Sequence, residues 1–459
     1  MESSKYLDKL ITFSLNSSPF GNQIIHILAA AIESVDPANA VTKAIKKHGD
    51  YLIAGSSSYS LNSFKNIYIV GMGKAGAPMA HATANILENR VKKGVVVVKE
   101  GYTLPDWHYN NICVYEASHP LPDERGLQST REIINLVQQA KETDLIICLI
   151  SGGASALFTQ PSPGITLEDL RSLTQHLLAS GATINEINIL RKHLDQVKGG
   201  QLAHLAYPAT VITLILSDVI GNPFDIIASG PTVPDLSSFS DAIQIIEKYD
   251  LLEKITPSIR THLERGVSGK IPETPKPDDP IFQRCASILI GSNEQAAQAA
   301  LIKAESYGLH TLLLTTSLQG EAREQGIDLG HLARLLVHEG KPIPIPACII
   351  AGGETTVTLH GNGMGGRNQE MALSAVKGIS GKENLWFITL ATDGGDGPSN
   401  AAGAVVNGDT MARAYALGLD PDDFLNRNDS YHFFEPLGDL LIPGATLTNV
   451  NDLAFIFAF

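Results

Sequence analysis

Short, almost entirely apolar segments alternate along the first part of the chain with segments in which apolar residues recur every three or four positions. Continuous apolar runs are typical of strands buried on both faces, and the wider spacing is typical of amphipathic helices. The predicted strands cover residues 65–71, 93–99, 111–117, 144–150 and 211–217, and the predicted helices cover 126–140 and parts of 165–206. This order predicts a Rossmann-like parallel sheet with helices on both faces.

A second alternation follows residues 269–280, whose prolines and mixed charges predict a linker. Its predicted strands are 286–292, 310–316, 346–354, 356–359, 385–391 and 453–459, and its predicted helices are 293–307, 321–338, 369–378 and 409–418. We therefore expect an α/β protein of two domains, residues 1–270 and residues 271–459. A chain of 459 residues also exceeds what one hydrophobic core usually organises.

Residues 5–50 carry helical spacing without an intervening strand. We expect them to form leading helices that cover another part of the protein. Sequence order alone leaves open whether helices within residues 1–50 pack on the first domain or on the second.

The composition of the chain disfavours several classes of function. With 44% hydrophobic and 18% charged residues the chain resembles an ordinary globular protein, and a net charge of −14 disfavours nucleic acid or an anionic membrane as a partner. No basic segment followed by an apolar core opens the chain, and no apolar window approaches 18 residues, so we expect a cytoplasmic enzyme. Cys113, Cys148, Cys285 and Cys348 lack the close pairs of a zinc site and are expected to be reduced core thiols.

The first candidate site is the glycine-rich turn Gly71–Gly76, which follows a predicted strand and opens a helix. It satisfies the G-x-G-x-x-G dinucleotide pattern, but Lys99-Glu100 meets only weakly the ribose-binding acid expected after the next strand. Gly73 and Lys74 suit anion binding, because an ammonium among exposed amides stabilises a phosphoryl group or a carboxylate. A solvated lysine on a packing turn is the alternative.

Ser151, Gly152 and Gly153 follow the apolar run 144–150, so their amides should lie at the carboxyl edge of the sheet, where open α/β folds bind ligands. An anion site is favoured there over a serine nucleophile, since G-x-S-x-G is not matched.

Arg191 and Lys198 are seven residues apart and are predicted to share one face of a helix that ends at Gly199-Gly200. They could bind substrate or form a solvated basic face.

In the second domain, Glu354 ends a predicted strand, and a glycine-rich loop leads through Gly365 and Gly366 to Arg367 and Asn368 at the start of a helix. A guanidinium beside exposed amides at a helix N-terminus is what phosphate or carboxylate recognition needs. A flexible surface hairpin is the alternative.

Carboxylates also stand at strand ends. Asp218 follows the run 211–217, and Asp393 and Asp396 follow the run 385–391 in the loop TDGGDG. Such positions suit Mg²⁺ binding or a general base, although turn-forming aspartates look the same. Cations, carboxylates and glycine loops in both domains predict an anionic, phosphorylated substrate in an interdomain cleft.

With these motifs assembled, the chain resembles the glycerate 2-kinases whose C-terminal part is called the MOFRL domain, a family sometimes labelled hydroxypyruvate reductase. The resemblance spans roughly residues 20–454. It is carried by IVGMGKAG, SHPLPDERG, LISGGASAL, LRKHLDQVKGGQLA, SDVIGNPFDIIASGPTVPD, GGETTVTLHGNGMGGRNQE, ATDGGDGPSNAAGA and NDSYHFFEPLGDL.

The resemblance implies transfer of the ATP γ-phosphoryl group to the 2-hydroxyl of D-glycerate with Mg²⁺, in a cleft between the two domains. By that resemblance Lys74 and Arg367 are the leading catalytic residues, and Asp218 and Asp393 are the metal or base carboxylates. The turn that begins at Ser151 would bind substrate or phosphate. The partners implied are a small-molecule substrate and a nucleotide, with a homodimer allowed for.

Three positions depart from the family's pattern. Asn222 and Asn400 replace aspartates, and residues 442–447 differ from a Thr/Gly-rich run. Two lost carboxylates could weaken a metal site, but the four leading residues are retained and predict activity. An NAD(P)H-dependent hydroxypyruvate reductase and a non-catalytic anion-binding protein remain alternatives, because the Gly71–Gly76 turn alone does not separate them.

Overall fold

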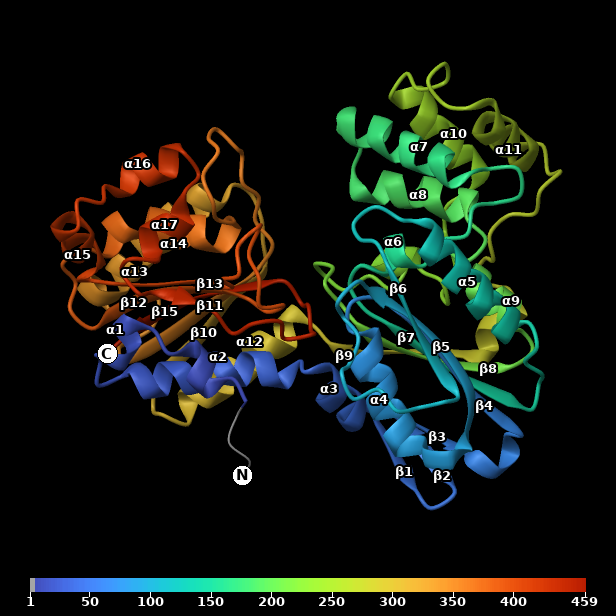
Figure 1. Cartoon of the computed structure of the whole chain (residues 1–459), viewed down its shortest axis with the longest axis horizontal. Coiled ribbons are helices and arrows are strands. Elements are labelled where there is room, and N and C mark those ends of the chain that lie inside the picture. The colour runs from blue at the N-terminus through green and yellow to red at the C-terminus, as the bar shows by residue number, and fades with distance from the viewer. Residues whose placement is uncertain (1–4) are drawn as a thin grey trace. The chain divides into compact units, whose positions relative to one another are not determined.

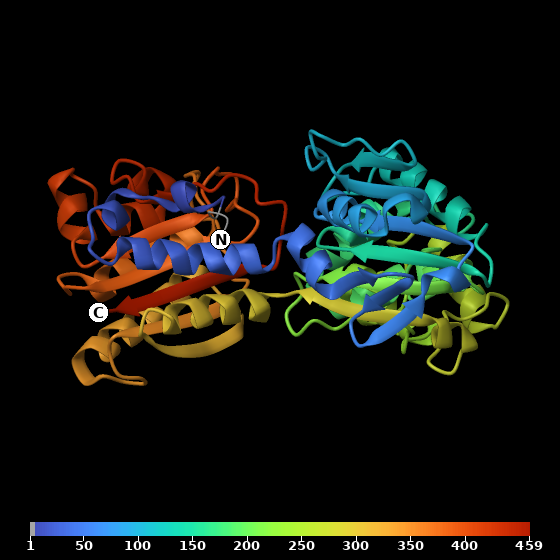
Figure 2. The ribbon, with the colours of Figure 1, turned by 90° about the horizontal axis from the view of Figure 1, so that it is seen from below.

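The computed structural model describes residues 5–459, which divide into two compact units (Figures 1 and 2). We call Pro37–Ile290 the N-terminal domain. The segment that ends at Asp36, together with Gly291–Phe459, is the C-terminal domain. Each domain has its own six-stranded sheet, as the two alternations in the sequence predict.

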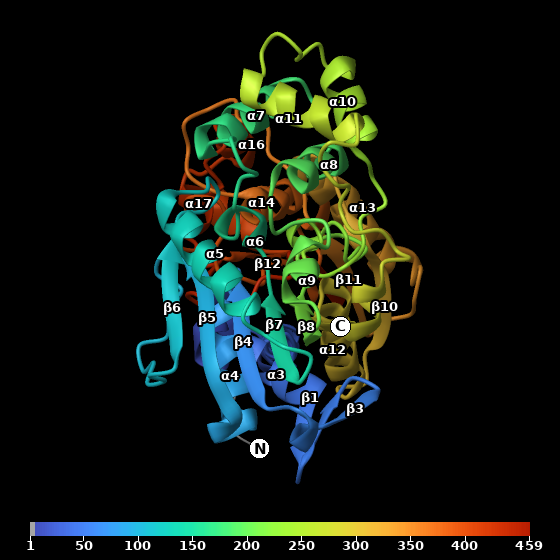
Figure 3. The same cartoon turned by 90° about the vertical axis from the view of Figure 1, so that its right-hand side faces the viewer.

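The sheet of the N-terminal domain has the strand order β6-β5-β4-β7-β8-β9. Its strands are β4 (Asn66–Met72), β5 (Val91–Lys99), β6 (Ile112–Ala117), β7 (Asp144–Ile150), β8 (Thr210–Leu216) and β9 (Cys285–Gly291). The first five pair in parallel, and Figure 3 shows them side by side. The chain builds outward from β4 in one direction and then from β7 in the other, so the topological switch point lies between these two strands.

Helices cover this sheet and form a separate bundle beside it. The helices are α3 (Pro37–Ala44), α4 (Gly76–Leu87), α5 (Glu124–Val137), α6 (Ala154–Leu157), α7 (Leu167–Ala179), α8 (Ile184–Leu194), α9 (Gln201–Ala206), α10 (Phe239–Lys248) and α11 (Pro257–Val267). Apolar residues of α5 and α9 pack on one face of the sheet. Helices α7, α8, α10 and α11 share their own apolar core, and capping boxes fix the starts of α7, α8 and α10.

The C-terminal sheet is mixed, with the order β10-β11-β15-β12-β13-β14. Its strands are β10 (His310–Leu318), β11 (Ala347–Gly353), β12 (Leu385–Ala391), β13 (Gly403–Asn407), β14 (Leu440–Leu441) and β15 (Asp452–Ala458). The last strand of the chain, β15, lies between β11 and β12 and runs antiparallel to both (Figure 2). Segments from three distant parts of the sequence therefore meet at the centre of this sheet.

The helices of this domain are α1 (Phe13–Asn16), α2 (Gly21–Ser34), α12 (Asn293–Glu305), α13 (Ala322–Glu339), α14 (Arg367–Ile379), α15 (Thr410–Ala416), α16 (Pro421–Asn426) and α17 (Ser430–Phe434). Helices α13 and α14 bury apolar residues on one face of the sheet. Helices α2 and α12 pack together on the opposite face, as Figure 1 shows.

The leading helices α1 and α2 belong to the C-terminal domain. Asp439, which is fully buried, accepts hydrogen bonds from the Ser14 backbone N–H at 2.9 Å and from the Ser14 hydroxyl at 2.8 Å. It also pairs with Arg413 Nη1 at 2.7 Å. The rings of Phe20 and Phe459 stack with centroids 4.0 Å apart. These contacts decide the packing that the sequence left open.

The division between the domains lies between Ile290 and Gly291, later than the predicted position near residue 270. Residues 269–280 are not a linker, because they pack on the N-terminal domain. Thr274 is buried and donates a hydrogen bond to Asp235 at 2.9 Å. The following apolar segment forms β9 at the edge of the N-terminal sheet, whereas the pattern assigned it to the second domain.

Three further predictions were wrong. Residues 45–48, predicted to be helical, form β1 (Ile45–His48) of a small antiparallel sheet with β2 (Tyr51–Ala54) and β3 (Ser57–Ser60). Residues 356–359 are not a strand, because Thr356 makes only an isolated bridge with Glu321. The four cysteines are free, but Cys113 is exposed and not a core residue.

Among the described helices, none is long and apolar enough on its own to cross a membrane, although the bent pair α2 and α3 passes the same criteria when counted together.

We predict that Asp439→Ala lowers the free energy of unfolding of the C-terminal domain by about 3 kcal/mol, because it leaves Arg413 without its buried carboxylate partner and Ser14 without its acceptor. Denaturant unfolding of wild type and variant measures the change. Asp328→Ala, at an exposed position on α13, is the matched control. Equal stability of all three proteins would show that the leading helices do not depend on this contact.

Candidate active site

Backbone hydrogen bonds join the two turns at the switch point of the N-terminal sheet. The Ser151 N–H donates to Met72 O at 3.0 Å, and the Lys74 N–H donates to Gly152 O at 2.9 Å. The Ser151 hydroxyl accepts from the Ala75 N–H at 2.9 Å. The structure therefore brings Lys74 together with the Ser151–Gly153 turn, at the sheet edge where the sequence placed both.

Gly73 is required for this arrangement. Its φ of +115° is one that side-chain-bearing residues rarely adopt, and a Cβ atom on Gly73 would lie 2.3 Å from Ser151 O. The glycine thus permits the close approach of the two turns and leaves Lys74 as the charged side chain that follows them.

His119 also lies at this site, and the residue-level analysis of the sequence missed it. A Cβ atom on Gly153 would lie 3.0 Å from His119 Cδ2 and 3.5 Å from Lys74 Cγ, so the two side chains flank Gly153. Burial, together with the charges of Lys74 and Lys99, lowers the pKa of His119 to about 4. The imidazole is therefore neutral near pH 7. The sequence feature that could have pointed to His119 is its position two residues after β6, inside the motif SHPLPDERG.

Asp218 lies two residues beyond the end of β8, the strand next to β7, and so stands at the same edge of the sheet. Asn222, in the same loop, has a φ of +55°. Asn and Asp both tolerate this conformation, so the departure from the family's aspartate preserves the turn.

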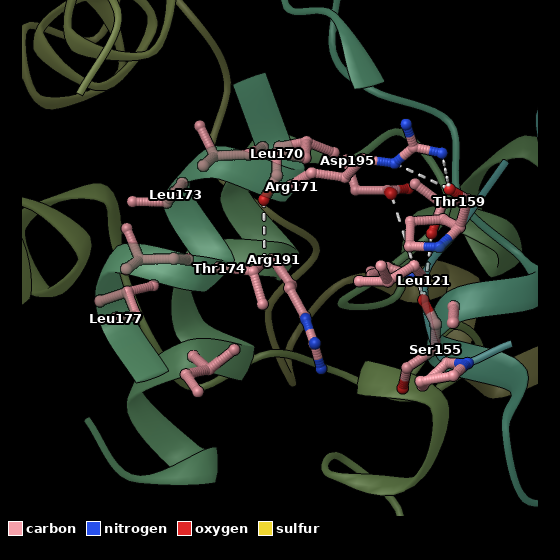
Figure 4. A pocket seen from close by; sticks show the side chains of 17 residues that line it. Leu121, Ser155, Thr159, Leu170, Arg171, Leu173, Thr174, Leu177, Arg191 and Asp195 are labelled. Carbon is pink, nitrogen blue, oxygen red and sulfur yellow. Dashed lines mark hydrogen bonds and ion pairs between the residues drawn. The ribbon is translucent and has the colours of Figure 1, made fainter. Parts of the chain in front are cut away.

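The prediction that Arg191 and Lys198 share one helical face was wrong, because α8 ends at Leu194. Lys198 is 2% exposed and donates hydrogen bonds to Ser155 O at 3.0 Å and to Phe158 O at 2.6 Å. Burial lowers its pKa to about 8, while Asp195 opposes this shift. The ammonium stabilises the carbonyl end of α6, which is a structural role. Arg191 lines a separate pocket, shown in Figure 4.

In the C-terminal domain, Arg367 is the first residue of α14 and is held by two carboxylates. Its Nε lies 2.5 Å from Asp452 Oδ2 and its Nη2 lies 3.3 Å from Asp452 Oδ1. Its Nη1 lies 3.0 Å from Glu354 Oε1. Glu354 is thus an ion-pair partner of the arginine. Its place among the substrate- and phosphate-binding residues stays a prediction.

Asp452, which the sequence did not single out, is the first residue of β15 and lies in register between Gly353 of β11 and Ala391 of β12. The sheet therefore fixes the carboxylate that orients Arg367. Burial raises the pKa of Asp452 to about 6, and the charge of Arg367 opposes this rise.

Asp396 and Asn368 have structural roles. Asp396 is buried and accepts hydrogen bonds from the backbone N–H groups of Asn368 at 3.1 Å and Gln369 at 2.9 Å. It therefore satisfies the first turn of α14 in the manner of an N-cap. The amides that the sequence assigned to anion binding at Asn368 already have this acceptor.

Gly365 and Gly366 allow two loops to approach closely. A Cβ atom on Gly365 would lie 2.1 Å from Ser430 Oγ, and one on Gly366 would lie 2.3 Å from Asp396 Oδ1. Packing against these loops accounts for both glycines. Asn400, the second departure from the family's pattern, accepts a hydrogen bond from the Tyr431 hydroxyl at 3.1 Å.

Asp393 lies two residues beyond the end of β12, and its Oδ1 accepts a hydrogen bond from the Gly395 N–H at 3.1 Å. Within residues 5–459 no group of three or more His, Cys, Asp or Glu side chains is arranged to hold a metal ion. Mg²⁺ at kinase sites usually takes only one or two carboxylates together with phosphate oxygens. Single carboxylates such as Asp218 and Asp393 fit that mode of binding.

Comparison with known proteins shows the family to which the chain belongs. Residues 23–264 match the family described as a domain of unknown function, DUF4147, and residues 347–452 match the MOFRL family. A glycerate 2-kinase from Pyrococcus horikoshii is 41% identical over 430 residues, which cover 94% of this chain and 95% of that protein. The chain belongs to the glycerate 2-kinase family.

The fold of this chain is similar to that in a crystal structure of glycerate kinase (EC 2.7.1.31) from Thermotoga maritima, with a TM-score of 0.85 and 39% identity. The match covers 95% of this chain and 99% of that one. An Agrobacterium vitis protein named putative hydroxypyruvate reductase is 40% identical over 84% of this chain and 98% of its own length. The family and the two-domain α/β fold expected from the sequence are both confirmed.

We predict that Lys198→Met lowers the free energy of unfolding by about 3 kcal/mol, because it leaves two carbonyl groups without donors and Asp195 without its cation. Denaturant unfolding measures the effect, and Lys270→Met, at an exposed lysine, is the control. Unchanged stability with weaker substrate binding would instead restore the substrate-binding role predicted from the sequence.

The low pKa of His119 predicts a specific acid sensitivity. Between about pH 6.5 and pH 4 the unfolded chain binds a proton that the folded protein excludes, so this contribution to stability is complete above pH 6.5 and is lost as the pH falls. We expect wild type to lose on the order of 2 kcal/mol more than His119→Gln across this window. Urea unfolding at a series of pH values measures both proteins. Parallel pH profiles would contradict the assignment.

Proposed function

We propose that this protein is a glycerate 2-kinase, which transfers the γ-phosphoryl group of ATP to the 2-hydroxyl of D-glycerate to give 2-phospho-D-glycerate and ADP. The observation that carries the proposal is the 41% identity to a glycerate 2-kinase along 94% of the chain. The joined turns around Lys74 support it, because they place this lysine at the sheet edge where open α/β folds bind ligands.

In this proposal Lys74 stabilises negative charge on the transferred phosphoryl group. Phosphoryl transfer leaves a protein little covalent chemistry to perform, so positioning and electrostatic stabilisation supply most of the rate. The Ser151–Gly153 turn keeps Lys74 in place through the hydrogen bonds between the two turns. These bonds fix the backbone at Lys74, which limits the positions that its side chain can take before the substrate binds.

Arg367 would bind a second anionic group of the substrates. Asp452 accepts from Nε and from one N–H of Nη2. Because each Nη atom carries two N–H groups, the guanidinium keeps donors for an anion beside the carboxylates. That Lys74 and Arg367 act on one substrate in a cleft between the domains stays a prediction.

A kinase takes ATP as a substrate, and we propose that Mg²⁺ accompanies it. Asp218 and Asp393 are the residues that would hold the ion, together with phosphate oxygens. When bound, Mg²⁺ neutralises the charge that develops on the phosphates. We also propose a cytoplasmic location and no nucleic-acid or membrane partner, as expected from the net charge of −14.

Reduction of hydroxypyruvate with NAD(P)H is the second candidate, since the strand order of the N-terminal sheet and the Gly71–Gly76 pattern also suit a dinucleotide. In such sites an acidic residue at the end of the second strand binds the ribose. Here Lys99 ends β5, and Glu100 pairs with Arg125 at 3.1 Å. This arrangement favours the kinase.

We predict that purified protein with ATP, Mg²⁺ and D-glycerate forms ADP and 2-phosphoglycerate, and that Lys74→Ala and Arg367→Ala each lower kcat by about two to three orders of magnitude. Coupled assays for ADP and for 2-phosphoglycerate measure this, beside NADH oxidation with hydroxypyruvate. NADH oxidation without ADP would establish the reductase, and neither product would favour a non-catalytic binding protein.

The controls separate catalysis from stability. Lys270→Ala and Arg334→Ala replace exposed cations and should keep wild-type turnover. Arg367→Ala leaves the buried Asp452 unpaired and should also lower the melting temperature, so Arg367→Ala combined with Asp452→Asn removes the unpaired charge. Recovery of turnover along with melting temperature in the double variant would reduce Arg367 to a structural residue.

A further inference from the structure

A pocket in the N-terminal domain lies outside the candidate active site. It lies between α7, α8, the Pro120–Pro122 loop and the region of α6 (Figure 4). The space not filled by protein atoms, counted together with the open solvent at the pocket mouth, is about 620 Å³. Neither Lys74 nor Ser151 lines it. Most of its wall is aliphatic, contributed mainly by Leu121, Leu170, Leu173, Leu177, Leu190 and Leu194.

Four charged side chains line the pocket, and three of them have strong protein partners. Arg171 donates to Pro122 O at 2.9 Å. Lys198 donates to the carbonyls at the end of α6, as described above. Asp195 accepts from the backbone N–H groups of Gln160 at 3.2 Å and Val197 at 3.0 Å. These three groups hold the walls together.

The fourth charged group, Arg191, is different. Within the described part of the chain, Arg191 Nη1 donates a hydrogen bond of 3.4 Å to Asn188 Oδ1, an oxygen that also accepts from the Ser229 hydroxyl at 3.0 Å. A bond of that length is weak. Figure 4 shows the guanidinium projecting into the pocket, away from the wall of α7. Most of its donors therefore face the pocket space.

The charge of the pocket favours an anion. Arg171 lies beside Glu168 at 3.5 Å, which offsets its charge. The other charged residues of the lining are the cations Arg191 and Lys198 and the anion Asp195, so the lining carries a net positive charge. The charge of Asp195 acts on Arg191, but among residues 5–459 no carboxylate forms a close ion pair with this guanidinium. Keeping a partly desolvated guanidinium without such a pair is costly, and a bound anion would offset that cost. Burial lowers the pKa of Arg191, in agreement with this setting.

The side chains of the pocket walls indicate which chemical group the ligand carries besides its anionic group. Leucine side chains stabilise a hydrocarbon body. The hydroxyl groups of a polyhydroxylated acid such as glycerate would lose water on entering, and only Ser155, Thr159 and Thr174 of the lining carry hydroxyl groups that could replace it. The preferred occupant thus combines one carboxylate with an apolar body.

We propose that this pocket is a second ligand site, which binds a short aliphatic or aryl carboxylate with its carboxylate on Arg191 and its hydrocarbon part among the leucines of α7 and α8. The site is separate from the kinase reaction and does not depend on it. A carboxylate matches the planar fork of the guanidinium in a bidentate manner.

The test uses the full-length protein and hexanoate as the probe, with binding measured by isothermal titration and by ligand-observed NMR. We expect saturable binding of hexanoate that Arg191→Met weakens at least tenfold, and no comparable binding of hexylamine or inorganic phosphate. Arg260→Met, at an exposed arginine of α11 in the same helical bundle, should bind hexanoate like wild type. Equal binding by Arg191→Met and wild type would overturn the proposal.

Two further measurements keep the outcome decisive. Ala156→Leu adds bulk to the wall without changing a charge, and it should also weaken hexanoate binding at least tenfold while circular dichroism shows a folded protein. Competition with D-glycerate and with ATP distinguishes the sites. Displacement of hexanoate by either compound at its KM would make the pocket part of the active site and would overturn a separate ligand site. So would phosphate binding as tightly as hexanoate.

Discussion

The arrangement of the N-terminal domain around its site depends on the contact between two turns at the carboxyl ends of β4 and β7. The Ser151 N–H, the Ser151 hydroxyl and the Lys74 N–H all take part in hydrogen bonds across this contact. It requires Gly73, because any side chain there would overlap Ser151 O. Since the strand order reverses between β4 and β7, this steric constraint coincides with the position where α/β sheets bind ligands.

The C-terminal domain reaches a comparable result by different means. Its cation, Arg367, is oriented by a buried carboxylate on the last strand of the chain, with a second carboxylate on Glu354. Two negative partners reduce the net charge that Arg367 presents, so its contribution is directional hydrogen bonding more than bulk positive potential. Lys74 lies beside a neutral imidazole, that of His119. The two cations are therefore not equivalent.

Several buried charges serve the fold and not the chemistry. Lys198 supports the end of α6, Asp396 supports the start of α14, and Asp439 holds α1 to the C-terminal domain. In each case the charged group satisfies backbone or side-chain partners that would otherwise be buried without hydrogen bonds. Arg191 lacks such partners at short distance, and for that reason it carries a ligand-binding inference while Lys198 does not.

Much of this protein was predictable from the order of its residues. Almost entirely apolar runs, such as the six residues 145–150, predict buried strands, because few other environments accept them. The glycine-lysine turn after the first parallel strand predicts an anion site, and the motifs from IVGMGKAG to ATDGGDGPSN predict the family. These features are local in sequence, so they can be recognised without knowing what lies nearby in space.

The tertiary structure alone decided which groups are already paired and which segments pack together. Asp452 orients Arg367 across 85 positions of sequence, and Asp439 contacts Ser14 across 425. Residues 269–280 have the composition of a linker but are held by Thr274 in the N-terminal domain. Long-range hydrogen bonds and burial leave no periodic trace in the sequence, because the two partners are chosen by the path of the chain and not by their neighbours. That is why the sequence identified the charged residues of this protein, while the fold determined what each charge does.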